Sequence, residues 1–119
     1  MISVNLTNII FKNGVYFSDE AVEFVEIEIY GHAEFGRKGT DVVCSAVSIL
    51  VQTMLLSLAK VIEAQQAIEK REGYLRTKIV LHKIDNKKKA QIILLLNFFV
   101  IGIFEIGRDY PENVEIKFS

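Results

Sequence analysis

Two hydrophobic periodicities alternate along this chain, and their order limits the folds that it can adopt. Apolar residues recur at every second position, as in a strand with one buried face, in residues 2–7, 22–30, 75–82 and 114–118. They recur at every third or fourth position, which is the helical spacing, in residues 41–62 and 88–108. The order ββαβαβ predicts an α+β fold in which a mixed or antiparallel sheet of about four strands packs against two helices.

The length and the composition narrow the class of protein. A chain of 119 residues has room for one hydrophobic core, so we expect a single domain over residues 1–119. The formal net charge of -1, from 14 Lys and Arg against 15 Asp and Glu, argues against direct binding of nucleic acid. The single cysteine, Cys44, excludes an intramolecular disulfide, and the N-terminal residues lack the continuous apolar run of a signal peptide. We therefore expect a cytoplasmic protein.

The most apolar stretch is residues 92–104, which follow three consecutive lysines and are similar in composition to a membrane anchor with a basic flank. Its length counts against that interpretation, because a bilayer span needs about 20 predominantly apolar residues. Gln91 and Glu105 close the run, and Asn97 interrupts it. We therefore expect a helix of the folded protein and no membrane insertion.

An apolar patch is expected on the outer side of this second helix. On a helical wheel, Leu94, Phe98 and Ile101 fall within the arc that holds the polar residues of the helix. A small monomer rarely leaves a contiguous apolar patch in water. The pattern therefore predicts a homodimer that buries these three side chains.

The stretch from Gly31 to Ser48 places a histidine at the end of an expected strand and a cysteine at the beginning of an expected helix; it reads GHAEFGRKGTDVVCSAVS. Thr40 or Asp41 can cap this helix, so that Cys44 lies about one turn inside it. A free thiol titrates at about pH 8.5, and the partial positive charge of a helix N-terminus favours the thiolate. Cys44 is therefore a candidate nucleophile. His32, across an eight-residue loop, is its candidate proton carrier.

Three further residues of this stretch can support such a site. Gly36 and Gly39 allow the loop to adopt positive φ, and they allow the backbone of a substrate to pass close by. Ser48 lies one helical turn beyond Cys44 on the same face, where its hydroxyl can form a hydrogen bond within the site or to a substrate.

Other interpretations of the same residues stay open. A lone cysteine in a helix is commonly a small buried hydrophobe, and a histidine at a strand end is commonly a surface or capping residue. A metal site formed by His32, Cys44 and His82 is a weaker alternative, because the sequence has none of the paired ligand spacings that are typical of zinc sites. We expect neither a metal nor a cofactor.

The same stretch resembles the signature of the ribosomal-processing cysteine protease family, Prp. That signature is G-H-A, a short loop with two glycines, D-[IV]-V-C and a serine four residues later. The residues that match it in order and spacing are Gly31, His32, Ala33, Gly36, Gly39, Asp41, Val43, Cys44 and Ser48. Ser45 stands where alanine is common. The element order of the family also resembles the one predicted above, so the likeness extends over essentially the whole chain.

The resemblance implies a cytoplasmic, homodimeric cysteine endopeptidase that removes the N-terminal extension of a large-subunit ribosomal protein and cuts beside aromatic residues. His32 and Cys44 would form the catalytic dyad. The positions that would bind substrate or support the site are Gly31, Phe35, Gly36, Gly39, Asp41 and Ser48. The competing function is that of a non-enzymatic ribosome-assembly factor, which would bind the ribosomal protein without cutting it and use Cys44 only as a core residue.

Overall fold

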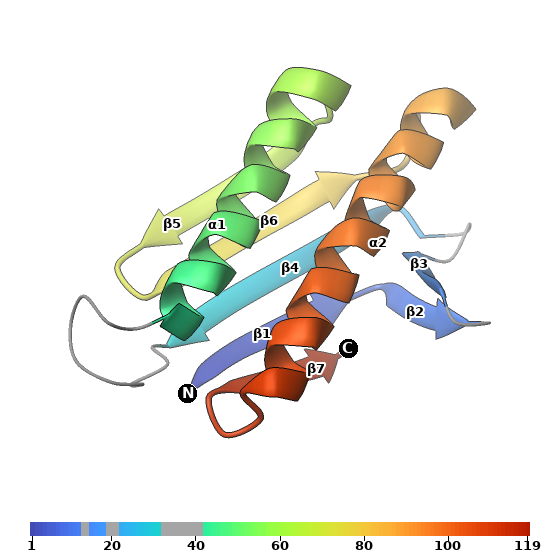
Figure 1. Cartoon of the computed structure of the whole chain (residues 1–119). Helices are drawn as coiled ribbons and strands as arrows, with labels where there is room; N and C mark the ends of the chain where they lie inside the picture. Colours follow the sequence, from blue (N-terminus) through green and yellow to red (C-terminus); the bar gives the residue numbers. More distant parts are fainter. Residues whose placement is uncertain (13–14, 19–21, 32–41) are drawn as a thin grey trace.

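The computed structural model describes residues 1–12, 15–18, 22–31 and 42–119 (Figure 1). The strands are β1 (Ile2–Thr7), β2 (Ile9–Lys12), β3 (Val15–Ser18), β4 (Phe24–Gly31), β5 (Gln66–Arg71), β6 (Tyr74–Val80) and β7 (Val114–Phe118). The helices are α1 (Val42–Ser57), which continues as the short π-helix η1 (Leu58–Ile62), and α2 (Asn86–Asp109). Both long helices lie where the helical periodicity predicts them.

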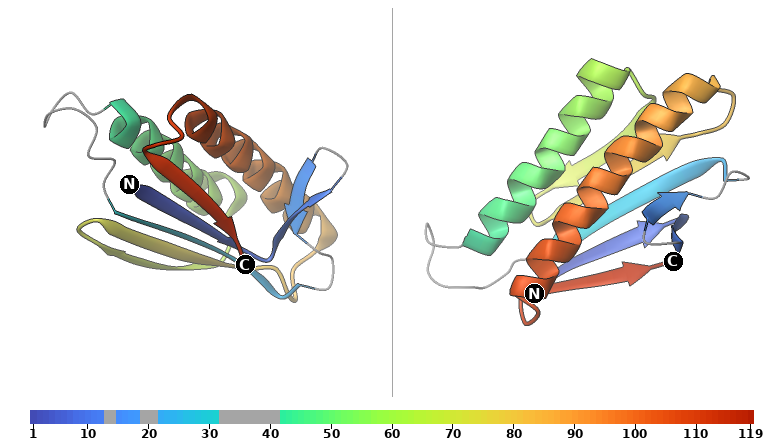
Figure 2. Two further views of the ribbon diagram at one scale, coloured as in Figure 1. Left: turned by 90° about the horizontal axis from the view of Figure 1, so that it is seen from below. Right: turned by 45° about the vertical axis from the view of Figure 1, so that its right-hand side comes forward.

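Five strands form one mixed sheet in the order β5-β6-β4-β1-β7. All neighbouring strands are antiparallel except β1 and β7, which run parallel. The two long helices lie side by side on one face of this sheet (Figure 2), and the other face carries charged side chains such as Arg76, whose Nε lies 3.8 Å from Oε1 of Glu26. The predicted α+β class and the packing of a mixed sheet against two helices are confirmed.

The number of strands differs from the prediction of about four, because β5, β2 and β3 were not expected. β5 has the sequence QAIEKR and lies at the edge of the sheet, where five of its six residues are exposed. Its charged residues break the alternation of apolar and polar positions by which a strand is predicted. It pairs only with β6, across a turn in which Gly73 adopts φ +69°. β2 and β3 form a separate two-stranded hairpin beside α2, in a region for which no element was predicted.

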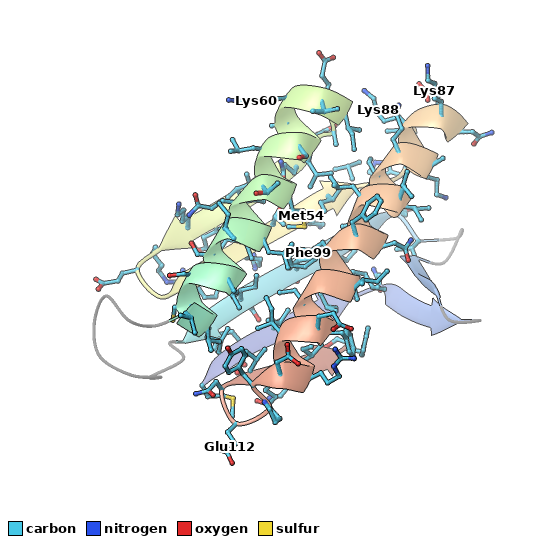
Figure 3. The ribbon with its side chains drawn as sticks, viewed as in Figure 1. Met54, Lys60, Lys87, Lys88, Phe99 and Glu112 are labelled. Carbon is cyan, nitrogen blue, oxygen red and sulfur yellow. The ribbon has the colours of Figure 1, made fainter. Side chains whose placement is uncertain are left out.

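The core lies between the sheet and the two helices. Met54 of α1 and Phe99 of α2 are both almost completely buried and lie in this layer (Figure 3). The other buried residues of the helices, which point to the same layer, are Val43, Val47, Val51, Leu58, Ile92, Leu96, Val100 and Ile103. α2 begins after Asp85, whose Oδ1 accepts a hydrogen bond from the backbone N–H of Lys88 at 2.7 Å and so caps the helix.

Two helical segments, Val42–Ile62 and Asn86–Asp109, are long and apolar enough to cross a membrane by length and composition alone. In each of them about a quarter of the residues of the most apolar stretch is buried inside the protein. These buried residues form the core layer on the sheet. The apolar composition of both helices is therefore explained in part by their packing on the sheet.

Candidate functional site

The end of β4 is fixed by the conformation and the neighbours of Gly31. Its φ is +93°, a conformation that side-chain-bearing residues rarely adopt. A Cβ atom built on Gly31 would lie 2.3 Å from the backbone oxygen of Met1, so the position has no room for a side chain. Its N–H donates a hydrogen bond to the carbonyl of Gly73 at 3.0 Å. β4 therefore ends at a defined place between β1 and the β5–β6 turn.

Cys44 lies in the first turn of α1, as the cap prediction requires. Its neighbour Val43 is completely buried and holds the start of the helix on the sheet. Cys44 itself is half-buried and packs at the margin of the core. Ser48 is exposed one turn further along, and its Oγ accepts a hydrogen bond from Nε2 of Gln52 at 3.1 Å. The Cys44 thiol, the Ser48 hydroxyl and the Gln52 amide therefore occupy the same flank of α1, which faces β5 and β6.

A groove of about 260 Å³ separates this flank of α1 from the sheet. Its apolar lining consists of Ile2, Ile29, Val47, Val51 and Leu75, and its remaining lining consists of Gly31, Cys44, Ser48, Gln52, Lys70, Arg71, Gly73 and Tyr74. An apolar interior with polar groups along the margin suits a peptide, because the interior can hold one apolar side chain while the margin binds the backbone.

The far wall of the groove is the end of the β5–β6 hairpin, and a polar cluster holds it in place. The hydroxyl of Tyr74 donates a hydrogen bond to Oε2 of Glu28 at 2.7 Å, and Nδ2 of Asn5 donates one to Oε1 at 2.9 Å. These two hydrogen bonds, that of Tyr74 first, lower the pKa of Glu28, and the first raises the pKa of Tyr74. The guanidinium of Arg71 lies 3.8 Å from the centre of the Tyr74 ring.

A sequence model described as cysteine protease Prp matches residues 14–115. The chain belongs to this family. It is therefore a member of a family of cysteine proteases, and the chain contains a single cysteine, Cys44. The groove and the Prp thiol consequently form a candidate active site.

Solved structures share the Prp fold over the full chain. The ribosomal processing protease Prp from S. aureus with a covalently linked product peptide is 20% identical, with a TM-score of 0.75 and coverage of 100% of both chains. The same S. aureus protease with a substrate peptide is 18% identical, with a TM-score of 0.71 and coverage of 100% of both chains. A protein from Streptococcus mutans is 28% identical, with a TM-score of 0.66 and coverage of 99% of this chain and 93% of that one. No curated protein matches the sequence.

The structure brings three of the predicted site residues together on the groove of this Prp chain: Gly31, Cys44 and Ser48. The other predicted positions, His32, Phe35, Gly36, Gly39 and Asp41, lie outside the described residues. His82, by contrast, follows the far end of β6, where its backbone N–H donates to the carbonyl of Glu23. Because β6 begins at the groove and His82 lies beyond its other end, this histidine and Cys44 are at opposite ends of the strand.

Within residues 1–12, 15–18, 22–31 and 42–119, no group of three His, Cys, Asp or Glu side chains could hold a metal ion. The described part of the site thus offers a thiol, hydroxyl and amide groups, and cations. These groups can attack a carbonyl carbon, bind a peptide backbone and orient a side chain, respectively.

Sequence reasoning missed the hairpin wall of the groove, to which Lys70, Arg71 and Tyr74 belong. The signal that could have found it is Gly73, which separates β5 from β6 in a two-residue turn. A strand before this turn would have been expected to pair with the predicted strand after it. Its end would then lie beside the end of β4, where Gly31 was already singled out.

Proposed function

We propose that this protein is a cysteine endopeptidase that removes the N-terminal extension of a large-subunit ribosomal protein, with Cys44 as nucleophile and His32 as general base. The observation that carries the proposal is the position of Cys44, half-buried in the first turn of α1 on the wall of an apolar groove. Gly31 lies on the same groove, and His32 is the next residue in the chain. The proposed general base, His32, is therefore joined by one peptide bond to Gly31, which lines the groove.

The proposed reaction has two steps. His32 takes the proton of the Cys44 thiol, the sulfur attacks the carbonyl carbon of the scissile peptide bond, and His32 returns the proton to the leaving amine as the C–N bond breaks. Backbone N–H groups at the start of α1 donate hydrogen bonds to the oxyanion. Water, deprotonated by His32, then attacks the thioester. This second step releases the carboxylate of the extension and regenerates the thiol.

We assign the apolar part of the groove to a substrate side chain beside the scissile bond, in line with cutting beside aromatic residues. Val47, Val51 and Leu75 would contact that side chain. Ser48 would support the pocket, and its hydrogen bond with Gln52 fixes the orientation of the hydroxyl. In this proposal the loop around residues 35–38 would close over the peptide, and Asp41 would hold the start of α1.

The ribosomal substrate and the cytoplasmic location are also proposals, and they rest on the family to which this chain belongs and on the chemistry of its thiol. The S. aureus relative is named as a ribosomal processing protease, and we extend ribosomal processing to this chain. A catalytic thiol must stay reduced, which agrees with a cytoplasmic location.

We also propose that the protein is a homodimer. The side chains predicted to form an apolar patch are exposed in one copy, Leu94 to 59%, Phe98 to 65% and Ile101 to 50%. A second copy would remove them from water. Light scattering at micromolar concentration tests this directly: a dimer mass is expected, and a monomer mass would contradict the proposal.

The experiment that tests the catalytic proposal mixes the purified ribosomal protein precursor with the wild type or with Cys44→Ala and measures intact masses over time. With the wild type we expect two products whose masses add up to the precursor plus one water. Cys44→Ala should bind the uncut precursor and yield no product. If the wild type binds the precursor and leaves it intact, as the variant does, the protein is a binding factor and the proposal is wrong.

A further inference from the structure

Strand β5 forms one edge of the sheet and pairs only with β6. The backbone N–H of Val80 donates a hydrogen bond to the carbonyl of Gln65 at 3.0 Å. Opposite residues of an antiparallel pair alternate between bonded and non-bonded positions, so every second residue after Gln65 bonds to β6. The backbone groups of Gln66, Ile68 and Lys70 therefore point away from β6, and in the part of the chain that the structure describes no other strand pairs with them. We call this row of backbone groups the free edge of β5.

The side chains along the free edge lie on the helix side of the sheet. Nε2 of Gln66 donates a hydrogen bond to the carbonyl of Leu55 in α1 at 3.2 Å, and Lys70 lines the same groove as Cys44. Ile68 lies between these two residues on the same face, because side chains alternate along a strand, and it is 50% exposed. The free edge therefore borders the groove at one end and carries an exposed apolar side chain two residues before it.

The direction of β5 relative to the thiol limits how a substrate can follow this edge. β5 runs from Gln66 toward the β5–β6 turn, so its last residues are those that lie at the groove (Figure 1). An N-terminal extension is removed by cutting at its C-terminal end, so this end must lie at Cys44. An extension that follows the free edge to the thiol therefore runs parallel to β5.

The groove end of the free edge is held in place by contacts to the rest of the sheet. The backbone N–H of Gly31 donates a hydrogen bond to the carbonyl of Gly73 in the β5–β6 turn at 3.0 Å. The hydroxyl of Tyr74, the first residue after this turn, donates one to Oε2 of Glu28 at 2.7 Å. A peptide that binds here does not have to order the edge, which lowers the free-energy cost of binding.

The groove beside the free edge indicates which kind of molecule would pair with it. A protease thiol attacks a peptide bond, and a peptide that lies extended in a groove brings unpaired N–H and C=O groups of its own. A second folded copy fits the edge less well, because Lys70 places a charge there and lysine on an edge strand opposes pairing with another sheet. The free edge is therefore suited to a peptide segment.

We infer that the N-terminal extension of the substrate binds as an added strand, parallel to β5, which pairs with the backbone of Ile68 and Lys70 and brings the scissile bond to Cys44. The inference rests on the proposed peptidase function. Every second side chain of the extension then faces α1. One of them enters the groove, and the one two residues before it contacts Ile68. The backbone bonds supply affinity for any sequence, and these two side chains supply selectivity.

Amide hydrogen exchange of the Cys44→Ala variant, with and without the uncut precursor, tests the pairing directly. Bound precursor is expected to slow the exchange of the N–H groups of Ile68 and Lys70 about tenfold or more. The N–H groups of Ala67 and Glu69 are the internal control, because they already bond to β6 and should not change. Unchanged exchange at Ile68 and Lys70 with bound precursor would overturn the inference. Protection that rises with protein concentration in the absence of precursor would also overturn it, because a second copy would then occupy the edge.

Two variants of Ile68 separate the backbone bond from the side chain. Ile68→Pro removes the N–H of the free edge, and Ile68→Ala is the matched control that keeps it. Proline is tolerated on an edge strand where the N–H faces solvent, so both variants are expected to fold, which thermal unfolding checks. The kcat/KM for the precursor should be about 3–10-fold lower in Ile68→Pro than in Ile68→Ala. Equal values in two folded variants would contradict the pairing.

N-methylated substrates test the same bonds without changing the enzyme. Synthetic peptides that span the extension and the cleavage site are methylated at one backbone nitrogen at a time before the scissile bond. Methylation at every second residue should lower kcat/KM of the wild type about tenfold or more, and methylation at the residues between should have little effect. Losses without this alternation, with normal cleavage of the unmodified peptide, would overturn the inference and leave the proposed function intact. Protection of Ile68 and Lys70 by a precursor that the wild type never cuts would confirm the pairing and reject the peptidase function.

Discussion

Helices α1 and α2 lie on the same sheet, and their most apolar stretches are equally hydrophobic, but they fill the core with side chains of different size. α2 inserts one valine, Val100, and four larger residues, Ile92, Leu96, Phe99 and Ile103. In the first three turns of α1 the buried residues are all valines, Val43, Val47 and Val51, and larger buried residues follow at Met54 and Leu58. The groove lies under the valine half of α1. The candidate site is therefore found where the core is built from small side chains.

The open space beside the thiol follows from this difference in side-chain size. Protein interiors are close-packed, so a helix that brings small residues to a sheet leaves space unless neighbouring groups move in. Here the β5–β6 hairpin stays at a distance, and the clustered hydrogen bonds of Glu28 and Tyr74 hold its end. Cys44 faces the resulting space from the start of the helix. Three predictions test this contrast between a close-packed α2 and an open α1, in order of decreasing expected effect.

The largest effect is expected from truncating the core of α2. Phe99→Ala should lower the free energy of unfolding by about 3–5 kcal/mol, because it opens a cavity in a close-packed layer. Val51→Ala in α1 should cost about 1.5 kcal/mol or less, because Val51 already borders the groove. Urea denaturation at one fixed protein concentration measures both values. Equal losses for the two variants would contradict the proposed difference in packing.

An intermediate effect is expected from filling the groove. Val51→Phe should occupy the space assigned to the substrate side chain and raise KM for the precursor by roughly 10–100-fold, while stability stays close to that of the wild type. The matched substitution in α2, Val100→Phe, should lower the free energy of unfolding by about 1–3 kcal/mol because no space awaits the larger ring. Steady-state kinetics and urea denaturation separate these outcomes. A Val51→Phe enzyme with unchanged KM would show that the groove is not the substrate pocket.

The smallest effect concerns the far wall of the groove and its dependence on pH. In the folded state the pKa of Glu28 is lowered below its ordinary value, chiefly by the hydrogen bond from Tyr74. The carboxylate therefore contributes stability above the unfolded-state pKa, and this contribution is lost as the pH falls through the lower folded-state pKa. Tyr74→Phe should reduce the loss of stability between pH 5 and pH 3. Thermal unfolding at both pH values tests this, and identical pH dependence in the two proteins would contradict the role of the hydrogen bond.

Much of the fold was predictable because the apolar periods are uninterrupted in the segments that form the core. The alternation of residues 2–7 and 114–118 and the helical spacing of residues 88–108 each led to an element close to the observed bounds. β5 was not predictable in the same way, because an edge strand with charged residues buries almost nothing and leaves no period in the sequence. The groove depends on this strand, so its far wall escaped prediction together with β5.

The candidate site was predictable only in part, for a related reason. Cys44 and Ser48 are one helical turn apart, so their common flank follows from the helix alone. The positive φ of Gly31 and its contact with Met1 depend on pairing between strands far apart in sequence. A run of small core residues in the sequence also does not distinguish a groove from a well-filled core. The difference is decided by the opposite wall, which the sequence did not reveal.

The most direct measurement is to trap the thiol with a peptide that ends in phenylalanine chloromethyl ketone and to solve the structure of the product. We expect a single thioether on Cys44, formed with loss of chloride, and a phenylalanine ring in the groove between Val47, Val51 and Leu75. An unmodified Cys44, or a ring bound outside this groove, would contradict the claim that the space under the first turns of α1 is the place where the protein cuts peptides.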